Sequence, residues 1–169
     1  AVRSGATLST HLGNGAHLTL PRHPNYIWEQ LASDELSAGV IADGFHLPRS
    51  VLKVFIKTKG SQLFLVSDAV YLSGLAPGEY HTHIGGRVVL TKDGRLHVAD
   101  NPGLLAGSAQ LLRMGVANLV RAGLSTTVDA WNKASIHPAA FMNIPEKRGL
   151  TAGAPADFVT FSWDSSGDL

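Results

Sequence analysis

The chain has 169 residues, 44% of them hydrophobic and 16% charged, which is the composition of a folded domain and not of a disordered segment. A net charge of +1 gives no reason to expect nucleic acid or an anionic membrane as a partner. Because there is no cysteine, disulfides and thiolate zinc sites are excluded, and any metal must be bound by His, Asp or Glu. The sequence contains no membrane-length apolar run and no signal-peptide pattern, so we expect a cytoplasmic protein. The start at Ala1 indicates a piece of a longer chain.

The first 69 residues alternate between strand and helix patterns. Apolar residues at helical spacing alternate with short β-branched runs. The last of these runs is continuously apolar, as expected of a parallel strand buried on both faces. Gly60 is a plausible helix stop. The expected strands are a short one ending near His11, then 37–44 and 63–69, and the expected helices are 26–31 and 48–59.

The second half begins with a different pattern. Residues from about 77 to 100 alternate like antiparallel strands with tight turns and predict a β-flap. A helix over 110–122 follows, then a second helix capped by Ser125 or Thr126. A shorter helix begins at His137, and a turn-rich link over 149–157 leads to an expected strand over 158–161.

Each strand of the first half is followed by a polar residue that metal or acid–base chemistry can use: His11, His46 and Asp68. Since the carboxyl ends of parallel strands meet at one edge, this order predicts a site on that rim of a parallel barrel or open α/β sheet. A carboxylate at the end of an apolar strand is costly to desolvate unless it is paired or used.

Local sequence leaves simpler interpretations open. His11 is either a polar loop residue or a metal ligand, and His46 is either a surface histidine or a substrate contact. Asp68 is either a cap or salt-bridge residue or a proton-transfer group. Arg22 is either an exposed loop charge or an anion ligand. The His-x-His pattern at 81–83 is interpreted as exposed strand histidines rather than a metal pair.

Taken together, five motifs in order resemble the N-acetylglucosamine-6-phosphate deacetylases of the amidohydrolase superfamily. The resemblance extends over essentially the whole chain and matches the C-terminal half of that family. The motifs are Thr10-His11-Leu12-x-Asn14, Gly39-Val40-Ile41-Ala42-Asp43-Gly44-x-His46, Leu65-Val66-Ser67-Asp68-Ala69, Leu104-Leu105-Ala106-Gly107-Ser108, and Asn132-x-Ala134-x-x-x-Pro138-Ala139 with the closing Gly149-x-x-x-Gly153-x-x-Ala156-Asp157.

This resemblance implies an α/β fold, the last part of a (β/α)8 TIM-like barrel with a β-flap insertion. Residues 1–148 would supply barrel strands 6–8 and the flap at about 77–100. Residues 149–169 would begin a small β-sandwich domain. The first five barrel strands, which carry other metal ligands of the family, would lie outside this chain.

The resemblance also implies residue roles. His11 would bind a divalent metal, zinc or iron, and Asp68 would be the catalytic acid and base. Arg22 would reach the phosphate of substrate bound in the neighbouring subunit, which implies a homodimer. The substrate-binding positions would be Asn14, Gly15, Arg22, Asp43, Gly44, Phe45, His46, Leu105, Ala106 and Gly107.

The implied reaction is metal-dependent deacetylation of N-acetylglucosamine-6-phosphate, in which the metal polarises the amide carbonyl and activates water. We expect the isolated chain to be inactive and unable to hold the metal tightly. The family has an aromatic residue and Ala-Met where this chain has Gly13 and Gly15-Ala16. Two alternatives therefore stay open: another amidohydrolase acting on a different N-acyl or cyclic amide substrate, and a noncatalytic barrel fragment.

Overall fold

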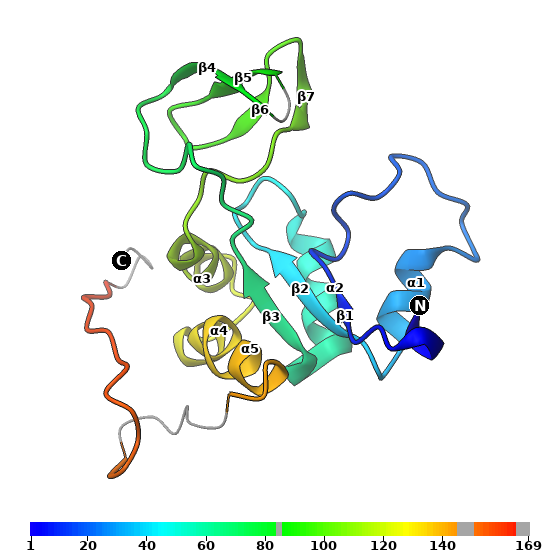
Figure 1. The fold of residues 1–169 in the computed structure, drawn as a ribbon, viewed down its shortest axis with the longest axis vertical. Coiled ribbons are helices and arrows are strands. Elements are labelled where there is room, and N and C mark those ends of the chain that lie inside the picture. Colours follow the sequence, from blue (N-terminus) through cyan, green and yellow to red (C-terminus); the bar gives the residue numbers. More distant parts are fainter. Residues whose placement is uncertain (84–85, 145–150, 165–169) are drawn as a thin grey trace.

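A computed structural model describes residues 1–83, 86–144 and 151–164. Its centre is a parallel sheet in the order β1-β2-β3, with a helix in each connection (Figure 1). These elements confirm the strand and helix order expected from the sequence. They are β1 (Leu8–Ser9), α1 (Tyr26–Ala32), β2 (Ser37–Ile41), α2 (Arg49–Lys59) and β3 (Leu63–Val66), with single 3-10 turns at Val2–Ser4 and Gly60–Gln62.

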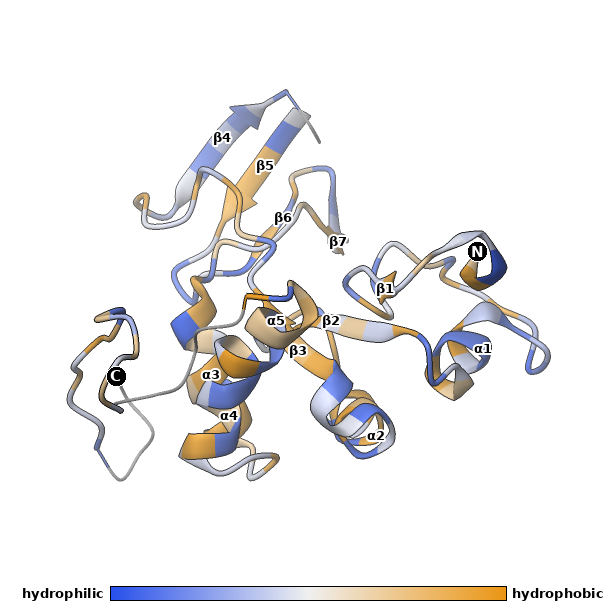
Figure 2. Cartoon of the chain, turned by 60° about the horizontal axis from the view of Figure 1, so that its bottom comes forward, coloured by the Kyte–Doolittle hydropathy of each residue, from blue (hydrophilic) through white to orange (hydrophobic). Residues whose placement is uncertain are grey.

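One face of the parallel sheet carries the main core. The register pairs Ala38 with Leu63 and Val40 with Leu65, so their side chains lie on the same face. Burying an aliphatic side chain of this size contributes about 1.5–3 kcal/mol. Figure 2 shows β3 as largely hydrophobic, beside helices that carry both hydrophobic and hydrophilic residues. The helical residues buried in this core are Leu31, Leu52, Phe55, Val116, Leu119 and Ala130.

The end of α2 is joined to the preceding connection by a buried lysine. Lys59 is 4% exposed, and its Nζ donates hydrogen bonds to the carbonyls of Ser33 (2.6 Å) and Leu36 (2.9 Å). Burial lowers the pKa of Lys59. The helix then ends at Gly60, as expected, in a left-handed conformation with φ +53°. Val54 lies outside the core at 46% exposed.

The β-flap is confirmed as an antiparallel sheet in the order β4-β5-β6-β7. Its predicted boundary near residue 100 is wrong, because the chain pairs as a strand through Leu105. The last strand is at the sheet edge, where a proline is tolerated because its missing N–H costs no ladder hydrogen bond. Leu72, Val88, Leu90 and Leu96 form a second, smaller core. The flap strands are β4 (Gly78–Thr82), β5 (Gly86–Leu90), β6 (Leu96–Val98) and β7 (Asn101–Leu105).

Three helices follow the flap and cover β3: α3 (Leu112–Arg121), α4 (Thr127–Ala134) and α5 (Ile136–Phe141). The Thr126 hydroxyl caps α4 by accepting from the Asp129 N–H at 3.1 Å, as predicted. The strand expected over 158–161 is wrong for the described part of the chain. The Phe161 ring instead lies 4.8 Å from that of Trp131. Of the described residues, no helix is long and apolar enough to cross a membrane.

Candidate functional site

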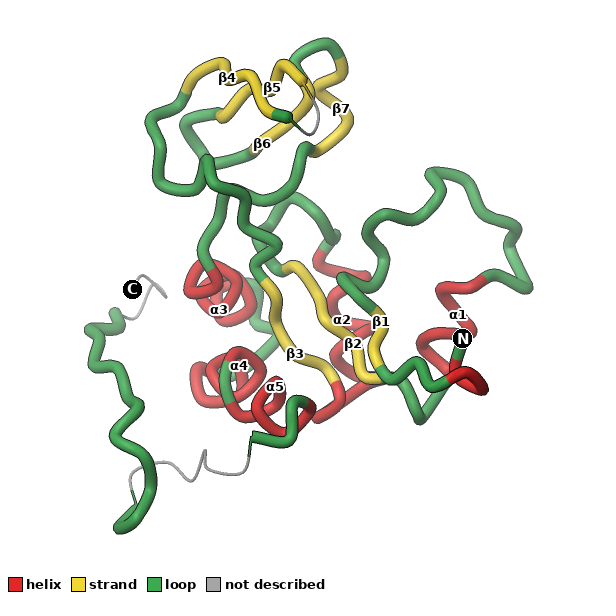
Figure 3. The backbone as a smooth tube through the Cα atoms, viewed as in Figure 1, coloured by secondary structure: helices red, strands yellow, loops and turns green. Residues whose placement is uncertain are grey.

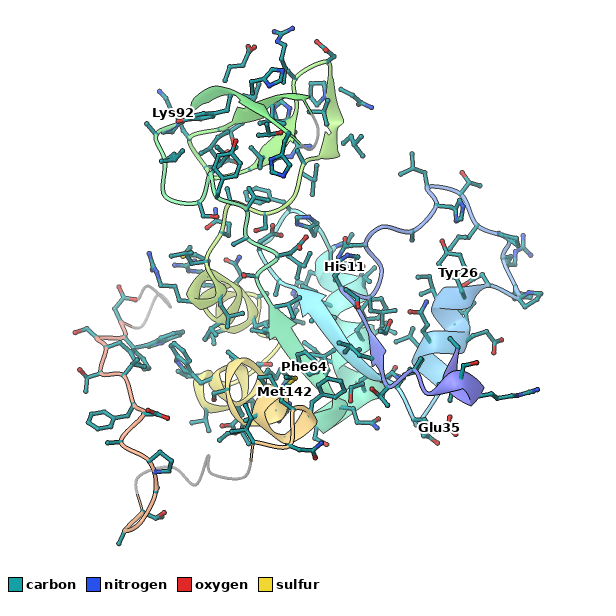
Figure 4. All side chains as sticks on the ribbon, in the orientation of Figure 1. His11, Tyr26, Glu35, Phe64, Lys92 and Met142 are labelled. Carbon is teal, nitrogen blue, oxygen red and sulfur yellow. The ribbon has the colours of Figure 1, made fainter. Side chains whose placement is uncertain are left out.

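Figure 3 shows the loops that follow the carboxyl ends of β1, β2 and β3. The sequence places His11, His46 and Asp68 in these loops. The flap stands beyond the same end of the parallel sheet. Figure 4 places His11 at this end, whereas Phe64 and Met142 lie toward the opposite end. Because β1, β2 and β3 are parallel, the loops after all three strands lie at the same end of the sheet.

The first group on the rim is formed by His11, Asn14 and Gly15. The backbone turns sharply after β1, with φ +30° at His11, and the Asn14 N–H donates to the His11 carbonyl at 2.9 Å. A Cβ on Gly15 would lie 3.3 Å from His11 Cε1, so the small residue lets the loop pass close to the imidazole.

Two buried polar atoms in this group have no hydrogen-bond partner among the described residues: His11 Nδ1 and Asn14 Nδ2. Buried polar groups are almost always hydrogen-bonded, and each unsatisfied one needs an explanation. A ligand or further protein at the rim would supply the missing partners. The pair therefore fits a metal-binding imidazole beside an amide that contacts substrate.

The second group follows β2 and is held by Asp43. Its Oδ1 accepts from the N–H groups of Phe45 (2.9 Å) and His46 (3.0 Å), and its Oδ2 lies 2.7 Å from His46 Nδ1. Since a carboxylate only accepts, Nδ1 carries the proton, and Nε2 is the ring atom left for a substrate. Burial raises the pKa of Asp43, but hydrogen bonds from His46 and Phe45 outweigh it and hold that pKa below its ordinary value.

Sequence reasoning missed Asn118, which supports this second group from α3. Its Nδ2 donates to the Ala42 carbonyl at 3.0 Å and lies 3.5 Å from where a Cβ of Gly44 would be. Gly44 itself has φ +89°, a conformation that favours glycine. The available signal was weak: Asn118 is a polar residue between the buried Ala117 and Leu119.

The third group joins the end of β3 to the end of the flap. Asp68 has φ +49°, and its carbonyl accepts from the Ser108 N–H at 3.3 Å. The Val70 N–H in turn donates to the Ser108 carbonyl at 2.9 Å. Asp68 is exposed, so its carboxylate does not bear the desolvation cost that a buried position at the end of an apolar strand would impose. Its carboxylate is therefore accessible at the rim.

The predicted substrate loop, Leu105 to Gly107, is brought beside this third group. A Cβ on Gly107 would lie 2.7 Å from Val70 Cγ1 and 3.9 Å from the Asp68 carbonyl. The three residues line a cavity of about 530 Å³ under the flap. A second cavity of about 440 Å³ is lined by residues that include Gly13 and His46.

Arg22 is not brought to the rim by the described contacts. It is exposed on the long loop between β1 and α1, which projects away from the sheet (Figure 1). Its carbonyl accepts from the Trp28 Nε1–H at 3.2 Å and from Asn25 Nδ2 at 3.3 Å. These two hydrogen bonds hold the loop near the start of α1, and Arg22 itself is exposed.

The donors present fit part of a metal site and not a whole one. A catalytic zinc takes three protein ligands and a water. Across residues 1–83, 86–144 and 151–164, no group of three His, Asp or Glu side chains could hold an ion. His11, with its unpartnered Nδ1, fits as a single ligand, so further ligands have to come from elsewhere.

Known proteins match the chain along nearly its whole length. No protein-family model matches it. The N-acetylglucosamine-6-phosphate deacetylase of Bos taurus is 34% identical over 166 residues, which are 94% of this chain and 40% of the bovine protein. The enzyme of the same name from Bacillus subtilis is 31% identical over 97% of this chain and 41% of its own length. The chain is homologous to part of the N-acetylglucosamine-6-phosphate deacetylases.

Solved deacetylase structures agree with the sequence comparison. The structure of the Mycobacterium smegmatis enzyme in complex with N-acetyl-D-glucosamine-6-phosphate matches with a TM-score of 0.77 and 25% identity, over 92% of this chain and 41% of that one. The resemblance expected from the five motifs is thereby confirmed. The chain spans about two fifths of the length of the deacetylases it matches.

Proposed function

We propose that the protein containing this chain hydrolyses N-acetylglucosamine-6-phosphate to glucosamine-6-phosphate and acetate. One observation carries the proposal: the chain matches proteins named for this reaction over 94% of its length. The water oxygen bonds to the acyl carbon, the carbon–nitrogen bond breaks, and the nitrogen leaves with a proton. In α/β proteins, substrates bind at the carboxyl ends of the parallel strands. The polar residues of this chain that could take part in the reaction lie at that end.

The proposed fold of the whole protein is a (β/α)8 barrel. In it, β1, β2 and β3 serve as strands 6 to 8, and the flap at 78–105 covers the carboxyl rim. Parallel pairing in sequence order and a helix in each connection support this arrangement. Residues 149–169 are proposed as the start of a small β-domain, and of these 149–150 and 165–169 lie outside the described residues.

Asp68 is the proposed catalytic acid and base. Its position after β3 and its exposure at the rim let its carboxylate take a proton from the attacking water and give it to the departing amine. The neighbouring Leu105, Ala106 and Gly107 would cover the bound substrate. The hydrogen bond from Ser108 to the Asp68 carbonyl supports this placement.

His11 is the proposed metal ligand of this chain. A divalent cation, zinc or iron, would polarise the amide carbonyl and lower the pKa of a water. The unpartnered Nδ1 supports the assignment. Asn14 and Gly15, which contact the same turn, would meet the substrate, and the proposal requires the remaining metal ligands from protein outside this chain.

His46 is proposed to hold the carbonyl oxygen or the sugar through Nε2. Asp43 fixes the ring through Nδ1, and the segment Asp43, Gly44 and Phe45 forms the loop that meets the sugar. The short hydrogen bonds within this loop support a fixed geometry for the imidazole.

Arg22 is proposed to bind the substrate phosphate of a neighbouring subunit in a homodimer. Its exposure on a projecting loop and the bidentate geometry of the guanidinium support this role. If it is correct, mixing Arg22→Ala subunits with Asp68→Asn subunits restores activity, because the heterodimer contains one complete site. Equal inactivity of the mixture would contradict the shared site.

The decisive assay measures acetate release from N-acetylglucosamine-6-phosphate by the metal-supplemented full-length protein. Asp68→Asn should lower kcat by a factor of about 10² to 10⁴, the range for general acid–base catalysis. Asp100→Asn, at an exposed flap position, is the matched control and should keep the wild-type rate. Cyclic amides and N-acyl amino acids test the alternative amidohydrolase function, and inactivity on all of them would favour a noncatalytic fragment.

A further inference from the structure

The cavity under the flap has a lining that does not suit a sugar phosphate. Its volume of about 530 Å³ lies in the range of pockets that hold whole small molecules. Of the described residues that line it, three have side chains that can form hydrogen bonds: Tyr71, Thr82 and His83. Hydroxyls and a phosphate buried there would lose their water without gaining enough partners. The remaining lining residues are Val70, Leu96, Val98, Leu104, Leu105, Ala106 and Gly107.

This apolar cavity begins at the group proposed to carry out proton transfer. Val70 and Gly107 both line the cavity, and Val70 lies two residues after Asp68. A Cβ on Gly107 would lie 3.9 Å from the Asp68 backbone carbonyl, so the wall of the cavity passes close to that residue. Asp68 would protonate the amide nitrogen, and that nitrogen is bonded directly to the acyl carbon. The nitrogen is also bonded to the sugar C2, and of these two neighbours the acyl group is the one that suits an apolar wall.

We infer that the cavity under the flap holds the acyl chain of the substrate and that the enzyme accepts N-acyl groups longer than acetyl. The inference rests on the proposed function and adds its substrate class: N-propionyl, N-butyryl and N-hexanoyl amino sugars. The methyl of an acetyl group would fill only a small part of the cavity. The reaction is the same amide hydrolysis, and it releases a longer carboxylate in place of acetate.

Burial of apolar chain predicts the size of the effect. Each buried methylene is worth about a fourfold gain in kcat/KM, so N-butyrylglucosamine-6-phosphate, with two more methylenes, should exceed the acetyl substrate by roughly fifteenfold. Val98→Phe places extra volume in the cavity and should return this ratio to about one. Val89→Phe makes the same change on the opposite face of the flap sheet, because Val88 and not Val89 pairs with Val98. It should keep the wild-type ratio.

The experiment measures kcat/KM for the acetyl, propionyl, butyryl and hexanoyl substrates with the full-length protein and both variants. If Val98→Phe fails to fold, Leu104→Trp at the exposed rim of the cavity replaces it. Acetyl hydrolysis without any gain for longer chains, or a gain that Val98→Phe and Leu104→Trp leave intact, overturns the acyl pocket while the proposed function stands. Absence of hydrolysis for the whole series overturns both.

Discussion

Asp43 holds His46 both by its ring and by its backbone. One carboxylate oxygen accepts two backbone N–H groups, and the other lies 2.7 Å from His46 Nδ1. The turn and the imidazole orientation therefore depend on the same charge. Loss of that charge should loosen both at once.

The first prediction concerns pH. The folded-state pKa of Asp43 lies below its ordinary value of 3.8, so its stabilisation is complete above that value and is lost as the pH falls through the folded pKa. In Asp43→Asn, the loss of folding stability at low pH that comes from protonation of Asp43 should be absent. Thermal unfolding of the full-length protein from pH 7 down to pH 3 tests it. Parallel Tm curves for wild type and variant would contradict the role of Asp43.

The second prediction concerns Asn118. Asn118→Ala removes the hydrogen bond to the Ala42 carbonyl and should cost about 1–3 kcal/mol of unfolding free energy. Because the bond supports the loop of His46, kcat should fall while KM for the intact substrate changes less. Denaturant unfolding and steady-state kinetics measure the two effects. Asn132→Ala, a matched change on α4, should leave kcat unaltered.

Sequence patterns were sufficient where structure is local. The continuous apolar run before Asp68 predicts β3, and the spacing of Leu52 and Phe55 predicts α2. The last flap strand was missed because Pro102 and Gly103 are poor strand residues, and only its place at the sheet edge makes them acceptable.

Long-range contacts limited the prediction of the site. The order of His11, His46 and Asp68 along the chain was enough to predict a common rim. The hydrogen bond between Asn118 and Ala42 joins residues 76 positions apart, and no local periodicity signals it. The exposure of Asp68 depends on the turn after β3, which apolar patterning does not encode.

The third prediction compares two glycines. Gly107 (φ +91°) and Gly74 (φ +88°) have nearly the same backbone conformation. A Cβ on Gly107 would lie 2.7 Å from Val70 Cγ1, whereas Gly74 has nothing within 4 Å. Gly74→Ala should cost about 1–2 kcal/mol from backbone strain alone. Gly107→Ala should cost about 1–3 kcal/mol more and lower activity.

Denaturant unfolding measures both glycine variants, and Val70→Ala separates their causes. Combined with Gly107→Ala, it should restore the unfolding free energy lost through the clash with Val70. Combined with Gly74→Ala, it should restore none. Equal costs for the two glycine variants would show that Val70 moves aside without penalty.

The fourth prediction concerns metal binding. The 169-residue chain alone should not bind Zn²⁺ tightly, because catalytic zinc needs three protein ligands and the described residues bring no such group together. The full-length protein should bind it, and His11→Ala should weaken that binding. Calorimetric titration measures the affinities. Tight one-to-one binding by the isolated chain would refute the shared ligand set.

The bridge between Ala69 and Ser108 has a consequence for how the fold can vary. It pairs the two ends of the flap excursion side by side, with the Val70 N–H donating to the Ser108 carbonyl at 2.9 Å. An excursion whose ends are already joined can change in length at little entropic cost to the rest of the chain. The flap also has its own small core. Its sequence could therefore be lengthened, shortened or replaced without moving Asp68, because the bridge between Ala69 and Ser108 holds the two ends of the flap together.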